Sequence, residues 1–282
     1  NGTRRATFPT TTVSAATPSS ERVLVLARAS TSFDSFSTPI GITVILDDAN
    51  RRLLVFGGTA DSTYFSDVWE YRIDTQVWSR VSTLGTSPPP RYSHSAVIDP
   101  VGRRMIVFGG IAKTTTGGQQ GLADLWSLSL DGSPVWTRLE DAPVHRQSHA
   151  AVWDSQRGSM VVAGGMDGSD RTYGDVWEWA PGSSPAWRQG TSRSGPYYAG
   201  STAILDEQDQ VLLMMGNRDP NFGGLSMHRL DLRTLQWSGS FDGPQPTGYN
   251  LFGYYDALRG QAVEVQGSVS WVLPLGAPPD PE

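Results

Sequence analysis

Apolar and polar positions follow a pattern along this chain that returns four times. In each copy an apolar run ends at glycine, a polar segment follows, and one or two tryptophans mark the later strands. The first three runs are LLVFGG, MIVFGG and MVVAGG, starting at Leu53, Met105 and Met160, and the worn fourth run, LLMMG, starts at Leu212. A period of about 50 residues is typical of repeat arrays. The repetition predicts a single closed domain.

The second copy predicts four short strands, over residues 93–99, 104–108, 125–130 and 135–139. The first and third of these segments alternate apolar with small or polar residues, as half-buried strands do. Glycines at 109 and 110 end the second strand, because a residue without Cβ allows the chain to bend sharply. We expect the segment after them, up to Ala123, to be a loop, with KTTTGGQQ (residues 113–120) as a mobile surface part.

An aspartate closes the first strand of every copy, just before a short polar turn. Its carboxylate is suited to this place because it can accept hydrogen bonds from nearby backbone amides. We interpret these residues as turn formers: Asp47, Asp99, Asp154, Asp206 and Asp256.

Two partial copies flank the four full ones. Residues 10–27 predict a strand, a turn and a second strand, and residues 249–275 predict three strands. Because an open array leaves unpaired strand edges, we expect residues 4–8 to supply the missing strand and join the two ends of the chain. This gives one domain over residues 1–276 and a Pro-rich linker or tail over 277–282. The array has six units, or five if the N-terminal hairpin only completes the last one.

Composition excludes several classes of site. The chain has no cysteine, which excludes disulfides, thiolate metal sites and cysteine nucleophiles. Its net charge of −6 gives no reason to expect nucleic-acid binding, and no apolar run is long enough to span a membrane. The compartment is left open, with an extracellular or cell-surface location favoured. The absence of cysteine fits a secreted bacterial protein, and we expect a bacterial origin.

The second copy, PRYSHSAVID followed by RRMIVFGG and ADLWSLSLDGSPVW, resembles the kelch repeat. The third copy matches from HRQSHA onward. The first copy departs from the pattern with Pro39 and Ile42 at the Arg and His places, and the fourth with Tyr198 and Ser201. The resemblance implies an all-β, kelch-type β-propeller of six blades, or five, each with four antiparallel strands. It also implies that the glycines and tryptophans pack the blades together.

Strand order predicts which loops share a face of such a propeller. The segments leading into each first strand lie with the segments after each Gly-Gly, at what we call the long-loop rim. The candidate ligand-binding residues on this rim are Arg91, His94, Arg146, His149, Tyr197, Tyr198, Tyr249 and Asn250. The four Arg and His residues belong to the repeat motif, so an alternative is that they bond neighbouring loops. The rim also carries Tyr64, Phe65, Tyr92, Lys113, Asp167 and Tyr173.

Two further clusters have ordinary structural interpretations. Asp167, Ser169 and Asp170 could offer oxygen ligands to calcium, but their spacing does not fit the twelve-residue calcium loop, and an Asp-Gly turn is the preferred interpretation. The opposite rim has paired arginines at Arg51-Arg52 and Arg103-Arg104, which could attract an acidic partner. Neighbouring aspartates cancel much of this charge, so solvated turns are preferred.

The sequence predicts a non-catalytic recognition module that binds a protein or glycan ligand at the long-loop rim. No spacing indicates a catalytic pair, and we expect no catalytic residue, no cofactor and no metal. The alternative is a carbohydrate-modifying enzyme resembling the kelch-type sialic-acid mutarotases. We expect a protein or glycan partner, no nucleic acid, no membrane insertion, and a place within a longer multidomain chain.

Overall fold

The computed structural model describes most of the chain between residues 41 and 274. The described residues are 41–60, 62–169, 171–190, 195, 202–206, 209–217, 225–241, 252–256, 261–266 and 269–274. Every regular element among them is a β-strand. The strands predicted within residues 4–27 and the tail at 277–282 lie outside the described residues.

Four consecutive sheets have four antiparallel strands each, and a fifth sheet has three. Blade 1 consists of β1 (Thr43–Asp47), β2 (Arg52–Phe56), β5 (Val68–Arg72) and β6 (Val77–Val81). Blade 2 consists of β8 (Ser95–Asp99), β9 (Arg104–Phe108), β12 (Leu125–Ser129) and β13 (Trp136–Arg138). Blade 3 consists of β14 (Ala150–Asp154), β15 (Ser159–Ala163), β16 (Val176–Trp179) and β17 (Trp187–Gln189). Blade 4 consists of β18 (Thr202–Asp206), β19 (Val211–Asn217), β20 (Leu225–Asp231) and β21 (Gln236–Phe241). Blade 5 contains β22 (Phe252–Asp256), β23 (Gln261–Gln266) and β24 (Val269–Pro274).

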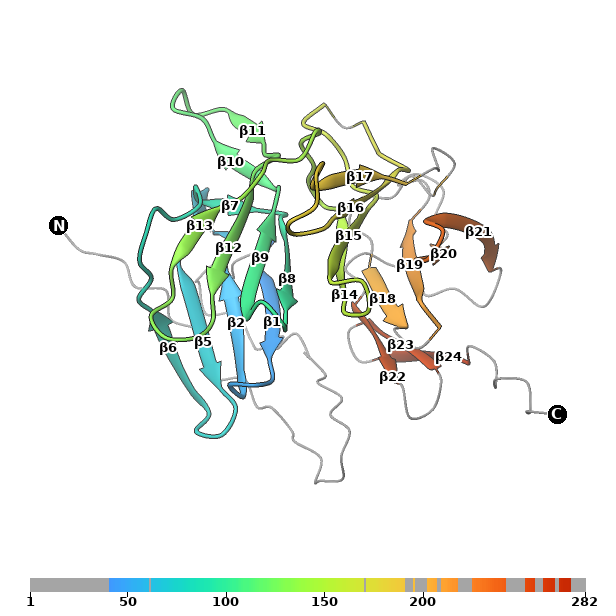
Figure 1. The fold of residues 1–282 in the computed structure, drawn as a ribbon, viewed down its shortest axis with the longest axis horizontal. Helices are drawn as coiled ribbons and strands as arrows, with labels where there is room; N and C mark the ends of the chain where they lie inside the picture. The colour runs from blue at the N-terminus through green and yellow to red at the C-terminus, as the bar shows by residue number, and fades with distance from the viewer. Residues whose placement is uncertain are drawn as a thin grey trace.

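The sheets follow one another as the blades of a propeller do (Figure 1). The first strands of the blades, β1, β8, β14, β18 and β22, contact each other in that order and form the inner layer. This arrangement confirms the all-β propeller that the repeats predict. The predicted closure of the ring by residues 4–8, and a sixth unit at 10–27, concern residues outside the described part.

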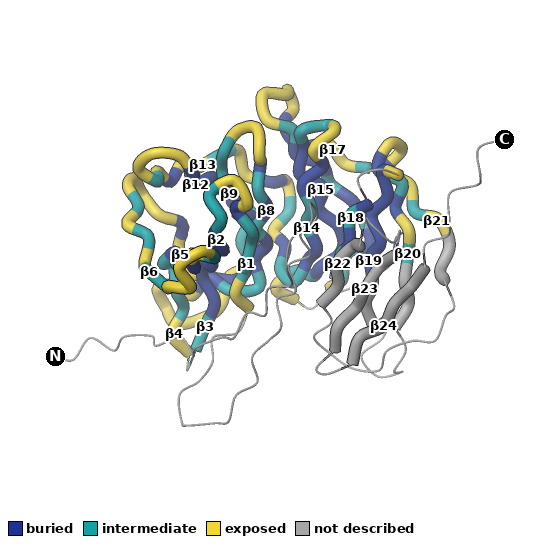
Figure 2. Tube along the Cα trace, turned by 90° about the horizontal axis from the view of Figure 1, so that it is seen from below, coloured by how far each residue is buried: buried dark blue, intermediate teal, exposed yellow. Residues whose placement is uncertain are grey.

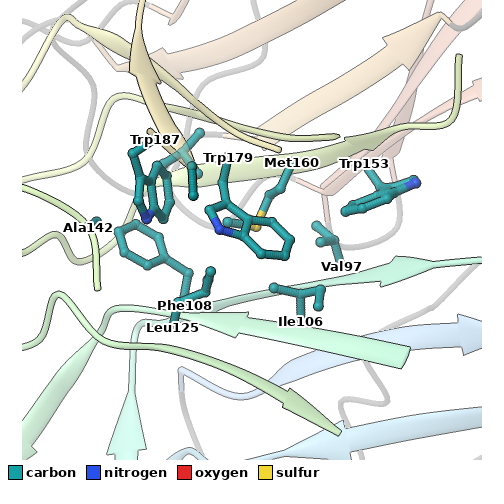
Figure 3. Packing of buried hydrophobic residues seen from close by; sticks show 11 residues of the cluster. Val97, Ile106, Phe108, Leu125, Ala142, Trp153, Met160, Trp179 and Trp187 are labelled. Atoms are coloured by element: carbon teal, nitrogen blue, oxygen red, sulfur yellow. The ribbon is translucent and has the colours of Figure 1, made fainter. Parts of the chain in front are cut away.

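The core lies between neighbouring blades (Figure 2). Between blades 2 and 3, Ile106 and Phe108 of β9 pack with Met160 of β15 and with Trp179 and Trp187 (Figure 3). Equivalent clusters lie between blades 1 and 2 and between blades 3 and 4. Each blade therefore buries apolar side chains of its neighbour. This agrees with the packing role predicted for the tryptophans.

Three of the aspartates that end the inner strands, Asp99, Asp154 and Asp206, accept backbone hydrogen bonds in turns, as predicted. The Oδ1 atom of Asp99 accepts a hydrogen bond from the Gly102 amide at 2.7 Å. The same atom of Asp154 accepts one from the Gln156 amide at 3.0 Å, and that of Asp206 one from the Asp209 amide at 3.1 Å.

The segments after the Gly-Gly pairs contain regular structure that the sequence did not predict. In blade 1 they form a hairpin of β3 (Thr59–Ala60) and β4 (Thr63–Tyr64), and in blade 2 a hairpin of β10 (Ile111–Lys113) and β11 (Gln119–Gly121). Strand β10 also pairs with β7 (Arg91–Tyr92). The prediction of a loop through Ala123 was therefore wrong. The Thr114 amide donates to the Gly118 carbonyl at 2.9 Å and closes a tight turn.

Candidate functional site

The long-loop rim is built around two buried arginines. Arg91 lies in β7, ahead of the inner strand of blade 2, and its side chain is fully buried. Its guanidinium donates to both carboxylate oxygens of Asp124, at 2.8 and 2.7 Å, and to the Gly109 carbonyl at 2.9 Å. Burial raises the pKa of the Asp124 carboxyl, but the hydrogen bonds and charge of Arg91 outweigh it and hold that pKa below its usual range.

Arg146 repeats this arrangement one blade further on. Its guanidinium donates to Asp175 at 2.8 Å and to the Gly164 carbonyl, and lies 4.4 Å from the ring centre of Tyr173. In both blades the bound aspartate also accepts a hydrogen bond from the indole two residues later, Trp126 or Trp177. The guanidinium thus fixes the segment after Gly-Gly to the start of the third strand.

Two buried histidines connect neighbouring blades. The Nε2 atom of His94 lies 2.8 Å from the Thr43 hydroxyl in blade 1, and that of His149 lies 2.8 Å from the Ser95 hydroxyl in blade 2. Burial, with Arg91 adding to it, lowers the pKa of His94 to about 3. Burial and the charge of Arg146 likewise hold the pKa of His149 well below its usual range. Both imidazoles are therefore neutral at physiological pH.

Backbone hydrogen bonds continue the connection around the inner layer. The Ser93 amide donates to the Gly41 carbonyl at 3.1 Å, and the Ser148 amide donates to the Ser93 carbonyl at 2.9 Å. Each of these residues leads into the inner strand of a different blade. The segments leading into blades 1, 2 and 3 are therefore connected to one another beneath the rim.

These contacts determine where the predicted site residues lie. Arg91, His94, Arg146 and His149 are all buried and bonded to internal groups, which supports the alternative interpretation that they connect neighbouring loops. A direct contact of these four with a ligand stays an untested prediction. The other four predicted residues, Tyr197, Tyr198, Tyr249 and Asn250, lie outside the described residues.

The rim also carries a hydrogen-bonded group at the seam between blades 1 and 2. The rings of Tyr64 and Tyr92 meet edge to face with centroids 5.0 Å apart. The side-chain amide of Gln119 donates to their hydroxyls at 2.9 and 3.2 Å. The Lys113 ammonium lies 5.1 Å from the Tyr64 ring centre and donates to the Ser62 carbonyl. We call Tyr64, Tyr92, Lys113 and Gln119 the seam cluster.

Gln119 was not among the candidates from sequence. It belongs to the polar stretch that was expected to be a loop. The signal that could have found it is the hairpin: a Gly-Gly turn at 117–118 places residues 113 and 119 opposite each other in antiparallel strands.

The Asp167 loop forms the Asp-Gly turn that was the preferred interpretation. The Asp167 carboxylate accepts hydrogen bonds from the Ser169 and Arg171 amides, at 2.8 and 3.0 Å. These bonds, chiefly the one from Ser169, lower the pKa of its carboxyl. In the described part of the chain, no group of three or more His, Asp or Glu side chains could hold a metal ion.

On the opposite rim the arginines are paired, in agreement with the expected charge cancellation. Asp47 accepts from Arg52 of its own blade at 3.0 Å and from Arg103 of blade 2 at 3.2 Å. Arg104 binds Asp99 at 2.9 Å. Burial raises the pKa of the Asp47 carboxyl, but hydrogen bonds from Asn50 and the two arginines outweigh it, and the net pKa is lowered. In the turns of this rim, the charges of the arginines are therefore neutralised by aspartates.

A comparison with known families decides what the repeats are. Residues 41–250 match the sequence model of the KLHDC2/KLHL20/DRC7 Kelch-repeats domain. The chain belongs to the kelch-repeat family. The matched range includes blades 1–4, and with them every Arg, His and Gly-Gly contact described above.

Relatives of this kelch domain are much longer proteins. Dynein regulatory complex subunit 7 of Chlamydomonas reinhardtii is 34% identical over 43% of this chain and 10% of its own length. Serine/threonine-protein phosphatase BSL2 of Arabidopsis thaliana is 31% identical over 73% of this chain and 20% of its own length. Human host cell factor 1 is 32% identical over 45% of this chain and 7% of its own length. The kelch chain thus matches a fifth or less of these relatives.

A solved structure supports the fold independently. The structure of YjhT superposes with a TM-score of 0.60 over 80% of this chain and 72% of that chain, at 16% sequence identity. At this identity the likeness concerns the kelch propeller fold alone. No helix in the described residues is long and apolar enough to cross a membrane.

Proposed function

We propose that this kelch domain is a non-catalytic recognition module that binds a protein or glycan ligand at the long-loop rim around the propeller axis. The observation that carries the proposal is the seam cluster, an aromatic, amide and cationic group at the surface of a rigid frame. Aromatic side chains and hydrogen-bonding groups on loops that a rigid scaffold holds in place are common at binding sites.

The charge state of the described carboxyl groups favours binding over catalysis. A general acid needs a raised pKa near the working pH. Among the described residues, each carboxyl group whose pKa is displaced is displaced downward, as at Asp124, where Arg91 opposes burial, and at Glu178, where Arg188 does. Such groups are fixed anions that stabilise the fold.

The kelch relatives support a role inside a larger protein. Dynein regulatory complex subunit 7 carries the name of a complex, and its matched segment is a tenth of its length. By analogy, we expect this domain to recognise a partner for a longer chain that contains it. Its bacterial origin and an extracellular location stay predictions.

Tyr197, Tyr198, Tyr249 and Asn250 are proposed as contacts of the ligand. The test compares the wild-type domain with a Tyr198→Ala/Tyr249→Ala double variant on a glycan array and in cross-linking capture from lysate with mass spectrometry. Binding to a defined glycan or protein that the double variant loses would support the proposal. Arg233→Gln, in an exposed turn of blade 4, is the control that should bind as the wild type does. Unchanged binding by the double variant would refute the assignment of these residues.

The enzymatic alternative is tested directly on the same protein. Proton NMR would follow the exchange of the two anomers of N-acetylneuraminic acid with and without the domain. Accelerated exchange that the Tyr198→Ala/Tyr249→Ala variant loses would overturn the non-catalytic proposal.

A further inference from the structure

The seam cluster lies on one face of a small sheet that rises from the long-loop rim. This sheet has the order β11–β10–β7, and its hairpin projects beyond the ends of the blade strands (Figure 1). Lys113 pairs with Gln119, and Ile111 pairs with both Gly121 and Tyr92. Because residues that are paired across strands, or two apart along one strand, share a face, Tyr92, Lys113 and Gln119 project from the same side. Tyr64 of blade 1 packs against that side.

Strand β11 is the outer strand of this sheet. The Leu122 amide donates to the Gly110 carbonyl, and the Thr114 amide donates to the Gly118 carbonyl, both at 2.9 Å. Hydrogen-bonded pairs alternate along an antiparallel ladder, so the backbone of Gln120 faces β10. The N–H and C=O groups of Gln119 then face away from β10, where the described residues provide no further strand. This edge can accept one more strand.

The positive charge beside this edge is the Lys113 ammonium. Lys113 is the only lysine of the chain. Its ammonium is held by a carbonyl and an aromatic ring, and no carboxylate of the described residues forms an ion pair with it. The motif carboxylates Asp124 and Asp175 are bound by Arg91 and Arg146. The Lys113 ammonium can therefore pair with an anionic group that a ligand brings.

The tyrosine hydroxyls add hydrogen-bonding capacity next to the ammonium. Both accept a hydrogen bond from Gln119. A hydroxyl that accepts a hydrogen bond still has its own O–H to donate. An ammonium beside a fixed O–H donor can hold the two oxygens of a carboxylate.

We propose that the free edge of β11 and the seam cluster form a docking site for an extended acidic peptide. The peptide adds to β11 as a fourth strand, and a glutamate or aspartate opposite Gln119 reaches Lys113 and the tyrosine hydroxyls. The added strand lies two strand spacings, about 10 Å, from β10, a span that a lysine and a glutamate side chain bridge together. Strand addition supplies backbone hydrogen bonds, and side chains select the sequence. The inference rests on the proposed function, since it specifies one partner class for the same rim.

The test uses fluorescence polarisation with a fluorescein-labelled eight-residue peptide of alternating threonine and glutamate. Peptides with glutamine or lysine in place of glutamate serve as comparators. The wild-type domain should bind the glutamate peptide best, and more weakly as salt increases, because exposed charges are screened. Lys113→Gln should weaken binding about fivefold, equal to about 1 kcal/mol.

Two further variants separate the edge from the charge. Gln119→Pro removes the outward N–H together with the side-chain amide and should abolish binding, whereas Gln119→Ala removes only the side-chain amide and should still bind. The thermal unfolding of Gln119→Pro should match the wild type because the hairpin lies outside the blade sheets. Gln120→Ala keeps the outward groups and should bind normally. Arg72→Gln removes one exposed positive charge at the opposite rim and should have no effect.

Several results would overturn the inference. These are no binding of the glutamate peptide at about 1 mM, equal binding of the glutamine peptide, and binding that Lys113→Gln and Gln119→Pro leave unchanged. Binding that only the Tyr198→Ala/Tyr249→Ala variant loses would move the peptide to the proposed axial contacts. A ligand found on the glycan array would leave the proposed function standing even if the peptide fails.

Discussion

Arg91 and Asp124 form a two-pronged ion pair, with Nη1 to Oδ1 at 2.8 Å and Nη2 to Oδ2 at 2.7 Å, and the arginine side chain is fully buried. The two residues are 33 positions apart, and the pair fixes the segment before blade 2 to the third strand of that blade. A planar guanidinium matches a carboxylate in this way, whereas an ammonium cannot.

Replacing Arg91 by methionine should destabilise the domain by about 3–5 kcal/mol, because Asp124 would be left as an uncompensated buried charge. Urea unfolding followed by tryptophan fluorescence measures the change. Arg80 pairs with Asp67 at 3.8 Å and is 69% exposed, so Arg80→Gln should cost about 0–1 kcal/mol. The Arg91→Met/Asp124→Asn double variant should be less destabilised than the sum of the single variants. Strict additivity would show that the pair is not coupled.

Stability should fall as the pH is lowered through the range where a free imidazole titrates. In the fold the pKa of His94 is lowered to about 3 by burial and by Arg91, whereas an unfolded histidine titrates near about 6.5. Between these values the unfolded chain binds a proton that the folded chain does not. The free energy of unfolding should therefore decrease by up to about 1.4 kcal/mol per pH unit for each such imidazole.

The measurement is urea unfolding between about pH 5 and pH 6.5, above the range in which most carboxyl groups titrate. His94→Gln should reduce the slope of the free energy of unfolding against pH by the contribution of one imidazole. Val101→Ala, at an exposed position without a titrating group, should leave the slope unchanged. Equal slopes for the wild type and His94→Gln would contradict the buried neutral state of His94.

Gly110→Ala should destabilise the domain far more than Gly132→Ala. Gly110 has a φ of +95°, and a Cβ there would lie 2.7 Å from the Tyr92 carbonyl oxygen and 2.8 Å from the His94 Cβ. Gly132 has a φ of +65°, with nothing within 4 Å of an added Cβ. At both positions alanine pays about 1 kcal/mol for placing a residue with a Cβ atom at positive φ. The steric clash occurs only at Gly110. Differential scanning calorimetry would compare them, and similar melting temperatures would rule out the tight contact.

Phe108→Ala should cost about 3–5 kcal/mol, because the ring fills the seam between blades 2 and 3. Its centroid lies 5.0 Å from the His149 ring and 5.1 Å from the Trp187 ring. Val101→Ala, at a position that is 89% exposed, should stay within about 0.5 kcal/mol of the wild type. Equilibrium unfolding in urea measures both. A small effect at Phe108 would mean that the seam can collapse around the missing ring.

The fold could be predicted because the same sequence pattern occurs in each repeat. Apolar alternation, Gly-Gly pairs and closing aspartates recur at one period, so a weak signal in one copy is reinforced by the others. The short rim strands could not be predicted in the same way. Strand β10 has three residues and depends on pairing with β7, about 20 positions earlier, a contact that no local pattern indicates.

The site was predicted less fully than the fold. The motif places Arg91 and His94 on the long-loop rim, but their burial follows from partners in other strands, such as Asp124 and Thr43. Gln119 carries no motif, and its importance arises only when the hairpin brings it to two tyrosines from different segments. Residues that act through local chemistry can be recognised in the sequence, while residues that act through assembly need the fold.

The histidine–hydroxyl contacts also limit how the blades can be rearranged. Thr43 and Ser95, the hydroxyl partners of His94 and His149, each occupy the first position of an inner strand. The corresponding residue of blade 3 is Ala150, and the copy after it has Ser201 in place of the histidine. At these three junctions the histidine and its hydroxyl partner are therefore present or absent together. One repeat therefore cannot simply replace another. Moving a repeat that carries the histidine to a new place would require a hydroxyl residue at the first position of the preceding inner strand.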